Sequence, residues 1–169
     1  TFRGRPESVA VNISFLDIEN RATRAFILNA LAEDPDLASR MVFEIVEEEG
    51  SKRFMVIREF IKRLRSLGAK VAIDDFGSGY SNFRRILELD VDYLKIDGSL
   101  IRHVVSEPKQ QHLVSVIAHF ARLSELPIVA EFVEDEATLE YLRQIGVQYA
   151  QGYHIGKPAP EPRPQSSGH

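Results

Sequence analysis

Two adjacent carboxylates are the strongest chemical feature of the sequence. Asp74 and Asp75 end the apolar run 71–73 and lead into 76–80, a stretch that contains two glycines. Neighbouring carboxylates at a buried strand end repel each other, so one must stay protonated unless a cation lies between them. A divalent metal ion is the simplest explanation, and a structural acid pair is the alternative for this dipeptide taken alone.

Polar residues end all six of the short apolar runs in the sequence. They are Asn12, Glu44, Asp74 with Asp75, Lys95 with Asp97, Glu131 and Gln151. The set offers oxygen ligands without cysteine or an obvious histidine, which suits Mg²⁺ or Mn²⁺ better than zinc. Two such ions about 3.5–4 Å apart would position and activate a water for attack on phosphorus, with Lys95 facing the phosphate or the water.

Each of the weaker candidates also has a structural explanation. Asn12 could bond a neighbouring loop, Gln151 could cap one, and the acids at 47–49 could form a solvated turn. Lys95 could form an ion pair with Asp97 or with a strand-end carboxylate. A different hypothesis makes Lys95 the Schiff-base nucleophile of an aldolase-type barrel, but that role needs a lowered pKa, and neighbouring acids would raise it.

The composition indicates an ordinary globular domain. The 169 residues are 44% hydrophobic, carry a formal net charge of −4 and contain no cysteine. This composition excludes thiol catalysis, thiolate zinc sites and disulfides, and the negative charge argues against binding of long nucleic acid. No apolar run approaches the roughly 20 residues of a membrane span. We therefore expect a cytoplasmic location and no membrane contact from this segment, with tethering only through other segments.

Six short runs rich in valine, isoleucine and other apolar residues predict β-strands. They are Val9–Val11, Met41–Phe43, Val71–Ile73, Tyr93–Leu94, Ile128–Ala130 and Val147–Ala150. Unbroken apolar runs are typical of strands covered on both faces, as in a parallel sheet wrapped by helices. Helical patterns alternate with them, around Phe26–Leu31, from Phe54 to Leu64 before Gly68, around Leu113–Ala121, and from an Asp135 cap to Gly146.

This alternation indicates right-handed βα units and an α/β fold. Polar residues at all strand ends favour a TIM-type (β/α) barrel over a doubly wound sheet, which would need a glycine-rich phosphate turn after its first strand. A complete barrel has eight strands, so we expect a partial barrel with about six βα units. The strands with Asn12 and Gln151 should then be its edges, and the proline-rich residues 159–169 a disordered tail.

Several strings occur together in one order along the chain. They are Val11–Ser14, Phe43–Glu47, Ala72–Ser81, Leu94–Asp97, Val129–Glu134, and Gln151–Tyr153 followed by Lys157 and Pro158. They resemble the EAL domain, the cyclic di-GMP phosphodiesterase family of bacterial signalling, over nearly everything from Val9 to Pro158. The resemblance implies that residues 1–158 are the C-terminal portion of an EAL domain, which hydrolyses cyclic di-GMP to linear pGpG.

The resemblance also implies a set of metal ligands. Asn12, Glu44 and Asp74 resemble the ligands of a first Mg²⁺ or Mn²⁺ ion. Asp74, Asp75 and Glu131 resemble the ligands of a second ion. Asp74 would therefore be shared between the two ions.

Three further residues match family positions with other roles. Lys95 resembles the lysine that holds the attacking water or the phosphate, and Gln151 the amide that completes the inner site. Glu47 resembles the acid that steadies the loop after Asp75, a loop that in the family also contributes to dimer contacts and regulation. A homodimer is therefore an expected assembly.

The sequence departs from the family pattern in two places. The Glu-Ala-Leu strand, whose Glu is a first-metal ligand, is absent, and Phe132 replaces the usual glycine after Glu131. The start at Thr1 suggests a fragment of a longer chain, with upstream sensor or diguanylate cyclase domains in the parent protein. We expect weak or no hydrolysis by the fragment itself. The alternative is a catalytically degenerate module that binds cyclic di-GMP or a protein partner as a sensor.

Overall fold

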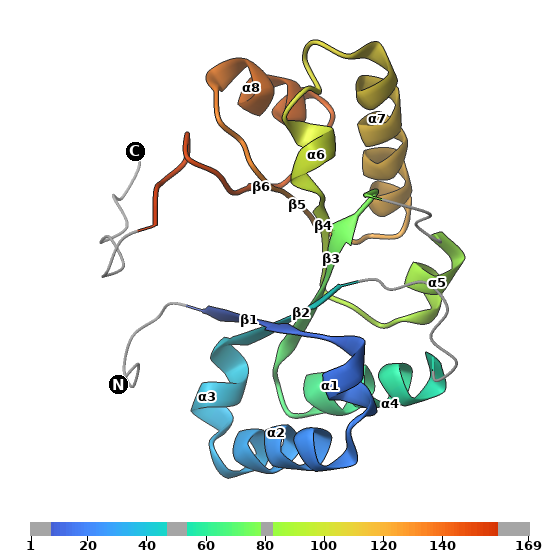
Figure 1. The fold of residues 1–169 in the computed structure, drawn as a ribbon, viewed down its shortest axis with the longest axis vertical. Helices are drawn as coiled ribbons and strands as arrows, with labels where there is room; N and C mark the ends of the chain where they lie inside the picture. The colour runs from blue at the N-terminus through green and yellow to red at the C-terminus, as the bar shows by residue number, and fades with distance from the viewer. Residues whose placement is uncertain (1–7, 47–53, 79–82, 159–169) are drawn as a thin grey trace.

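The computed structural model describes residues 8–46, 54–78 and 83–158, which form one parallel sheet flanked by helices (Figure 1). The strands follow one another in the sheet in chain order, and every neighbouring pair is parallel. They are β1 (Val9–Ile13), β2 (Met41–Val46), β3 (Lys70–Phe76), β4 (Tyr93–Ile96), β5 (Ile128–Ala130) and β6 (Tyr149–Ala150). The expected α/β architecture, a (β/α) barrel in part, is confirmed.

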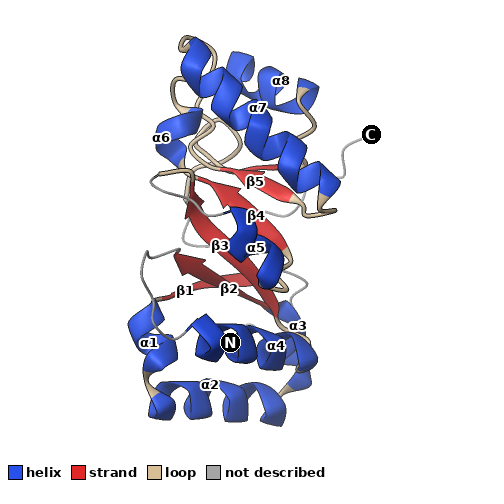
Figure 2. Ribbon diagram, turned by 90° about the vertical axis from the view of Figure 1, so that its right-hand side faces the viewer, coloured by secondary structure: helices blue, strands red, loops and turns tan. Residues whose placement is uncertain are grey.

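Apart from α5 (Phe83–Glu88), which lies across the middle of the sheet, the helices form two groups at its opposite ends (Figure 2). The helices of the two groups are α1 (Phe15–Glu19), α2 (Arg21–Glu33), α3 (Pro35–Arg40), α4 (Phe54–Ser66), α6 (Gly98–Ile101), α7 (Pro108–Leu123) and α8 (Glu136–Gln144). The first three helices and α4 lie near β1 and β2, whereas the last three lie near β4 and β5. In the described part of the chain, no helix is long and apolar enough to cross a membrane.

Helix α4 shows how the sequence pattern produces the packing. Its predicted apolar stripe is confirmed, with Ile57, Ile61 and Leu64 buried against the sheet. The helix ends at Ser66, and Gly68 follows with a φ of +96°, the left-handed conformation that glycine adopts without strain. This turn directs the chain into β3, the strand that carries both adjacent aspartates.

The central strands are more deeply buried than the edges. Ile45, Val71, Ile73 and Leu94 are at most 1% exposed, as expected of strands covered on both faces. The edge strand β1 differs, because Val11 is 39% exposed. Within the described residues β1 and β6 are the two edges, so the predicted positions of the edge strands are confirmed.

Several local details differ from the sequence prediction. Four short helices, α1, α3, α5 and α6, were not predicted, because segments of four to six residues carry too few turns for a helical period. Strand β6 begins at Tyr149 rather than Val147, since the Val147 N–H bonds back to Leu142 O and closes the end of α8. The predicted disordered tail, 159–169, lies outside the described residues and stays a prediction.

Candidate functional site

Lys95, the third residue of β4, lies at the centre of the candidate site. Its Nζ is 2.9 Å from Glu44 Oε2, 2.8 Å from Asp74 Oδ1 and 2.9 Å from Glu131 Oε1. The lysine side chain is only 5% exposed, so these charges meet in a nearly dry environment. The four residues come from β2, β3, β4 and the end of β5, which are consecutive in the sheet, so the carboxyl ends of parallel strands bring them together.

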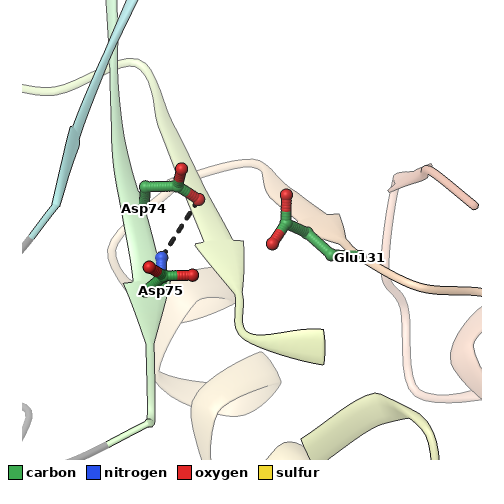
Figure 3. A group of neighbouring side chains, drawn as sticks. All are labelled: Asp74, Asp75 and Glu131. Atoms are coloured by element: carbon green, nitrogen blue, oxygen red, sulfur yellow. Dashed lines mark hydrogen bonds between the residues drawn. The ribbon is translucent and has the colours of Figure 1, made fainter. Parts of the chain in front are cut away.

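Asp75 adds another carboxylate to the cluster. Asp74, Asp75 and Glu131 each offer an oxygen, and these atoms lie within 4.8 Å of one another (Figure 3). Figure 3 shows Asp74 and Asp75 on β3, with the Glu131 carboxylate facing them from across the site. A cluster of this kind needs two consecutive residues of one strand to serve the same site.

The backbone at Asp75 makes this possible. Successive side chains of a strand normally point to opposite faces. Here φ of Asp75 is +55°, and the register between β3 and β4 shifts between Ile73 and Phe76. The Asp75 N–H donates to Asp74 Oδ1 at 3.0 Å, which ties the two residues together. The left-handed conformation stores about 1–2 kcal/mol of strain, which the surrounding structure must hold.

The cluster carries more negative than positive charge. Among the described residues, four carboxylates gather around the Lys95 ammonium. Burial by itself lowers the pKa of Lys95, but hydrogen bonds to Asp74, Glu131 and Glu44 outweigh burial and raise it above its usual value. The lysine is therefore held in its charged form, which is the opposite of what the Schiff-base hypothesis requires.

Two of the acids are destabilised in their charged form. Burial raises the pKa of Glu131, and repulsion by Asp74 and Asp75 adds to this effect against the attraction of Lys95. Burial also raises the pKa of Asp75, with repulsion from Asp74 and Asp97. Additional positive charge in the cluster would relieve both effects.

The donor set fits a divalent cation. Carboxylate oxygens within 4.8 Å of one another are the ligands that Mg²⁺ and Mn²⁺ prefer. The surplus of negative charge supplies the electrostatic reason for such an ion. The residues present thus fit the metal that the sequence predicts.

Asn12 and Gln151 approach the site from the two edge strands. Asn12 pairs in register with Glu44 across β1 and β2, and it is exposed. Gln151 directly follows β6, where its N–H bonds to Ala130 O at 2.8 Å and its carbonyl accepts from Val133 N–H at 3.0 Å. These two backbone hydrogen bonds lie on either side of Glu131 in the chain and connect its segment to Gln151. The side-chain roles of Asn12 and Gln151 stay predictions.

Two other predicted residues have different outcomes. Glu47 lies outside the described residues, so its role stays a prediction. Asp97 does not serve as the partner of Lys95, because its Oδ1 accepts a hydrogen bond from Ser99 N–H at 2.9 Å and caps α6. Of the two ion-pair alternatives, the pairing of Lys95 with strand-end carboxylates is confirmed.

A cavity of about 520 Å³ adjoins the acid cluster at Glu131. Its lining includes Arg102, Glu131, Phe132, Gln151, Tyr153 and Lys157. Such a volume is within the usual range for a small-molecule site. Sequence reasoning missed Arg102 and Tyr153 as lining residues. The only signals were the position of Arg102 just after the helix that follows β4, and that of Tyr153 two residues after Gln151.

These features define a (β/α)-barrel protein with an acidic site at the carboxyl ends of its strands. The chain belongs to the EAL domain family, whose sequence profile matches residues 1–158. The family resemblance expected from the sequence motifs is thus confirmed.

Three known proteins illustrate the similarity. Cyclic di-GMP phosphodiesterase PdeF of Escherichia coli (strain K12) is 36% identical over 151 residues, which cover 89% of this chain and 20% of PdeF. Cyclic di-GMP phosphodiesterase PdeB of Shewanella oneidensis is 40% identical over 126 residues, or 74% of this chain and 15% of PdeB. The structure of PaMucR phosphodiesterase in complex with c-di-GMP superposes with a TM-score of 0.82 at 31% identity, covering 90% of this chain and 62% of that one. The chain thus spans a fifth or less of the length of these two curated relatives.

Proposed function

We propose that this chain forms part of an EAL domain that hydrolyses cyclic di-GMP to linear pGpG. The observation that carries the proposal is the buried contact of Lys95 with three carboxylates beside Asp75 at the carboxyl ends of β2 to β5. In this reaction a water oxygen bonds to phosphorus, the bond from phosphorus to the 3′ oxygen breaks, and that oxygen leaves with a proton. The names of the relatives support the choice of substrate.

The metal assignment within this proposal uses the acids of the cluster. Asn12, Glu44 and Asp74 would hold one Mg²⁺ or Mn²⁺ ion, and Asp74, Asp75 and Glu131 a second. When bound, two such ions polarise a phosphodiester and lower the pKa of a water that attacks it. The close approach of the oxygens of Asp74, Asp75 and Glu131 supports the second set.

The remaining roles follow from charge and position. Lys95 stays protonated at Nζ and presents positive charge to the phosphate or to the attacking water. Glu131 would contribute a carboxylate to the second metal site, while its Oε1 lies 2.9 Å from Lys95 Nζ. Gln151 would hold the substrate at the inner site, and Glu47 would steady the loop that follows Asp75. A homodimer, upstream sensor or cyclase domains and a cytoplasmic location stay predictions.

The experiment measures turnover and binding separately in the full-length protein. We expect release of pGpG from cyclic di-GMP with Mg²⁺ or Mn²⁺, loss of activity on chelation with EDTA, and recovery on adding the ion back. Titration calorimetry with Ca²⁺ measures binding without turnover. Binding without release of pGpG would contradict hydrolysis and assign the sensor function instead.

A matched pair of substitutions tests the assignment of the site. Glu131→Gln should abolish turnover, because it removes a carboxylate from the cluster. Glu136→Gln, on the exposed face of α8, removes a carboxylate only five residues away and should leave turnover unchanged. Equal effects of the two substitutions would contradict the placement of the active site.

A further inference from the structure

Phe132 has an unusual backbone conformation for its residue type. Its φ is +52°, and among the described residues only Asp75 and Glu125 share positive φ without being glycine. A bulky side chain in this region is strained, whereas glycine would adopt it freely. Strain of this kind persists only where the surroundings hold it, and it is concentrated at ligand sites.

The ring of Phe132 contacts two residues of α6 and its C-terminal end, Gly98 and Arg102. A Cβ at Gly98 would lie 2.0 Å from Phe132 Cδ2, so the missing side chain of Gly98 makes room for the ring. The guanidinium carbon of Arg102 lies 4.5 Å from the ring centroid, in cation–π contact. These two contacts favour one position of the ring.

A ring that served only to fill the core would be buried. Phe132 is instead 46% exposed and lines the 520 Å³ cavity together with Arg102, Gln151 and Tyr153. Because Phe132 directly follows Glu131, its Cα lies about 3.8 Å from that of a residue that contacts Lys95. Glu131 lines the same cavity, so a ligand against this ring lies beside the acid cluster.

We propose that the Phe132 ring is a stacking surface for a guanine base of cyclic di-GMP. This inference rests on the proposed function and adds a binding residue to it. Flat aromatic rings bind nucleobases face to face, and because Arg102 lies over one face of the Phe132 ring, the base would stack on the other face. Arg102 holds the ring and places positive charge in the same cavity, which suits a ligand that carries both bases and phosphates.

Kinetics on the full-length protein test the stacking contact. Phe132→Leu keeps an apolar side chain but loses the flat face, and Phe132→Gly also removes the backbone strain. For both variants we expect KM, and the Kd measured with Ca²⁺, to rise about 10-fold, with kcat changed less than about 3-fold. Phe132→Tyr keeps the ring and should bind like the wild type. The control is Phe26→Leu on α2, an equally conservative change at a residue that is 75% exposed.

Fluorescence gives a readout that a purely structural role would not change. These 169 residues contain no tryptophan, so Phe132→Trp introduces an emitting ring at the proposed stacking surface, and its emission is measured as the difference from the wild-type protein. We expect its emission to be quenched when cyclic di-GMP is added with Ca²⁺, whereas Phe26→Trp should not respond. Unchanged emission in a variant that still binds would overturn the stacking contact.

The outcomes separate this inference from the proposed function. If the wild type hydrolyses cyclic di-GMP and Phe132→Leu and Phe132→Gly have the wild-type KM, stacking at Phe132 is wrong and hydrolysis stands. If the wild type neither binds nor hydrolyses cyclic di-GMP, both proposals are wrong. A selective rise of KM in the two variants without an aromatic ring supports both.

Discussion

The two ends of the central strands each carry an ion cluster, and the clusters differ in balance. At the carboxyl ends, Lys95 contacts Glu44, Asp74 and Glu131, with Asp75 beside them. At the amino ends, Arg65 of α4 pairs with Asp90 and Asp92, just before β4. Each cluster contains several acids and one base. The two are therefore distinguished by how much negative charge exceeds the positive charge and by how deeply it is buried.

The amino-end cluster has one more acid than base, and the Asp90 side chain is 77% exposed to solvent. The pairing of Arg65 with Asp92 is bidentate, with Nε 3.2 Å from Oδ2 and Nη2 3.2 Å from Oδ1. Asp92 Oδ2 also accepts a hydrogen bond from Val71 N–H at 2.9 Å. These bonds tie α4, the start of β3 and the start of β4 together. The carboxyl-end cluster instead gathers four carboxylates around one buried lysine, a larger surplus of negative charge, and includes Asp75 with its positive φ. The difference indicates a structural tie at one end and a cation-binding site at the other, as in barrels generally.

The largest expected effect separates activity from stability at Asp74. Asp74→Asn in the full-length protein should lower turnover at least about 1000-fold, or about 4 kcal/mol in activation free energy, because it removes the carboxylate that the proposal shares between the two ions. The Asn oxygen can still accept from Asp75 N–H, and the surplus charge falls, so Tm in EDTA should not decrease. Pairing pGpG release with thermal unfolding measures both. Near-wild-type activity with Mg²⁺ would contradict the two-metal assignment.

The next effect tests whether Lys95 compensates the acids when no metal is bound. Lys95→Met should lower the free energy of unfolding in EDTA by about 3 kcal/mol, since it leaves buried carboxylates unpaired. Mg²⁺ should restore part of this loss, because a divalent ion replaces the missing positive charge. Urea unfolding with and without Mg²⁺ measures the recovery, and equal losses in both conditions would argue against a cation site here.

Lys95→Met also tests catalysis. The substitution should lower kcat far more than it weakens binding of cyclic di-GMP measured with Ca²⁺, as expected of a group that acts on the transition state. If kcat and affinity fell by the same factor, Lys95 would be a binding residue only.

At the amino end we expect a substitution to lower stability and to leave turnover unchanged. Asp92→Asn should lower the free energy of unfolding by about 2 kcal/mol, because it weakens charge-assisted bonds to Arg65 and to Val71 N–H. Turnover per folded molecule should stay unchanged, since Asp92 lies at the other end of the strands. Urea unfolding and pGpG release test this, and a loss of kcat would break the distinction between the two ends.

The sequence predicted the members of the carboxyl-end cluster better than their geometry. Parallel strands end at one edge, so polar residues such as Glu44, Lys95 and Glu131 could be assigned to one site from their positions alone. The sequence could not predict the positive φ of Asp75. It also could not decide whether Lys95 pairs with Asp97 or with the strand-end carboxylates. These two features depend on a bulge and on contacts between residues that are distant in sequence.

The same limit applies to the fold. A helical apolar period predicted α4 and short unbroken apolar runs predicted the central strands, whereas α6 was missed because its four residues show no period. Its local signal was Asp97, a cap that accepts from Ser99 N–H, but sequence reasoning treated Asp97 as a possible partner of Lys95. The contact of Phe132 with Gly98 and Arg102 joins two separate βα units and has no local signal.

Acids near the carboxyl end can also be structural, and the direction of the pKa shift distinguishes them. Burial raises the pKa of Asp75 and Glu131. The pKa of Asp135 is instead lowered, chiefly by the hydrogen bond from Thr138 N–H, which the Asp135 carboxylate accepts at 2.7 Å as the N-cap of α8. Asp135 is therefore stabilised as a carboxylate by the fold itself.

The smallest expected effect tests this assignment of Asp135. Asp135→Ala should lower the free energy of unfolding by about 1 kcal/mol at pH 7, because α8 loses its cap. Since the pKa in the folded state lies below the ordinary 3.8, the charge contributes stability above pH 3.8, and this contribution disappears as the pH falls through the folded value. Asp135→Asn keeps a capping oxygen without the charge, so its difference from the wild type should shrink on acidification below pH 3.8. Urea unfolding at pH 7 and across this acidic range measures it. If the wild type instead became more stable relative to Asp135→Asn as the pH fell, the pKa of Asp135 would be raised in the folded state. Asp135 would then resemble Asp75 and Glu131 rather than a structural cap.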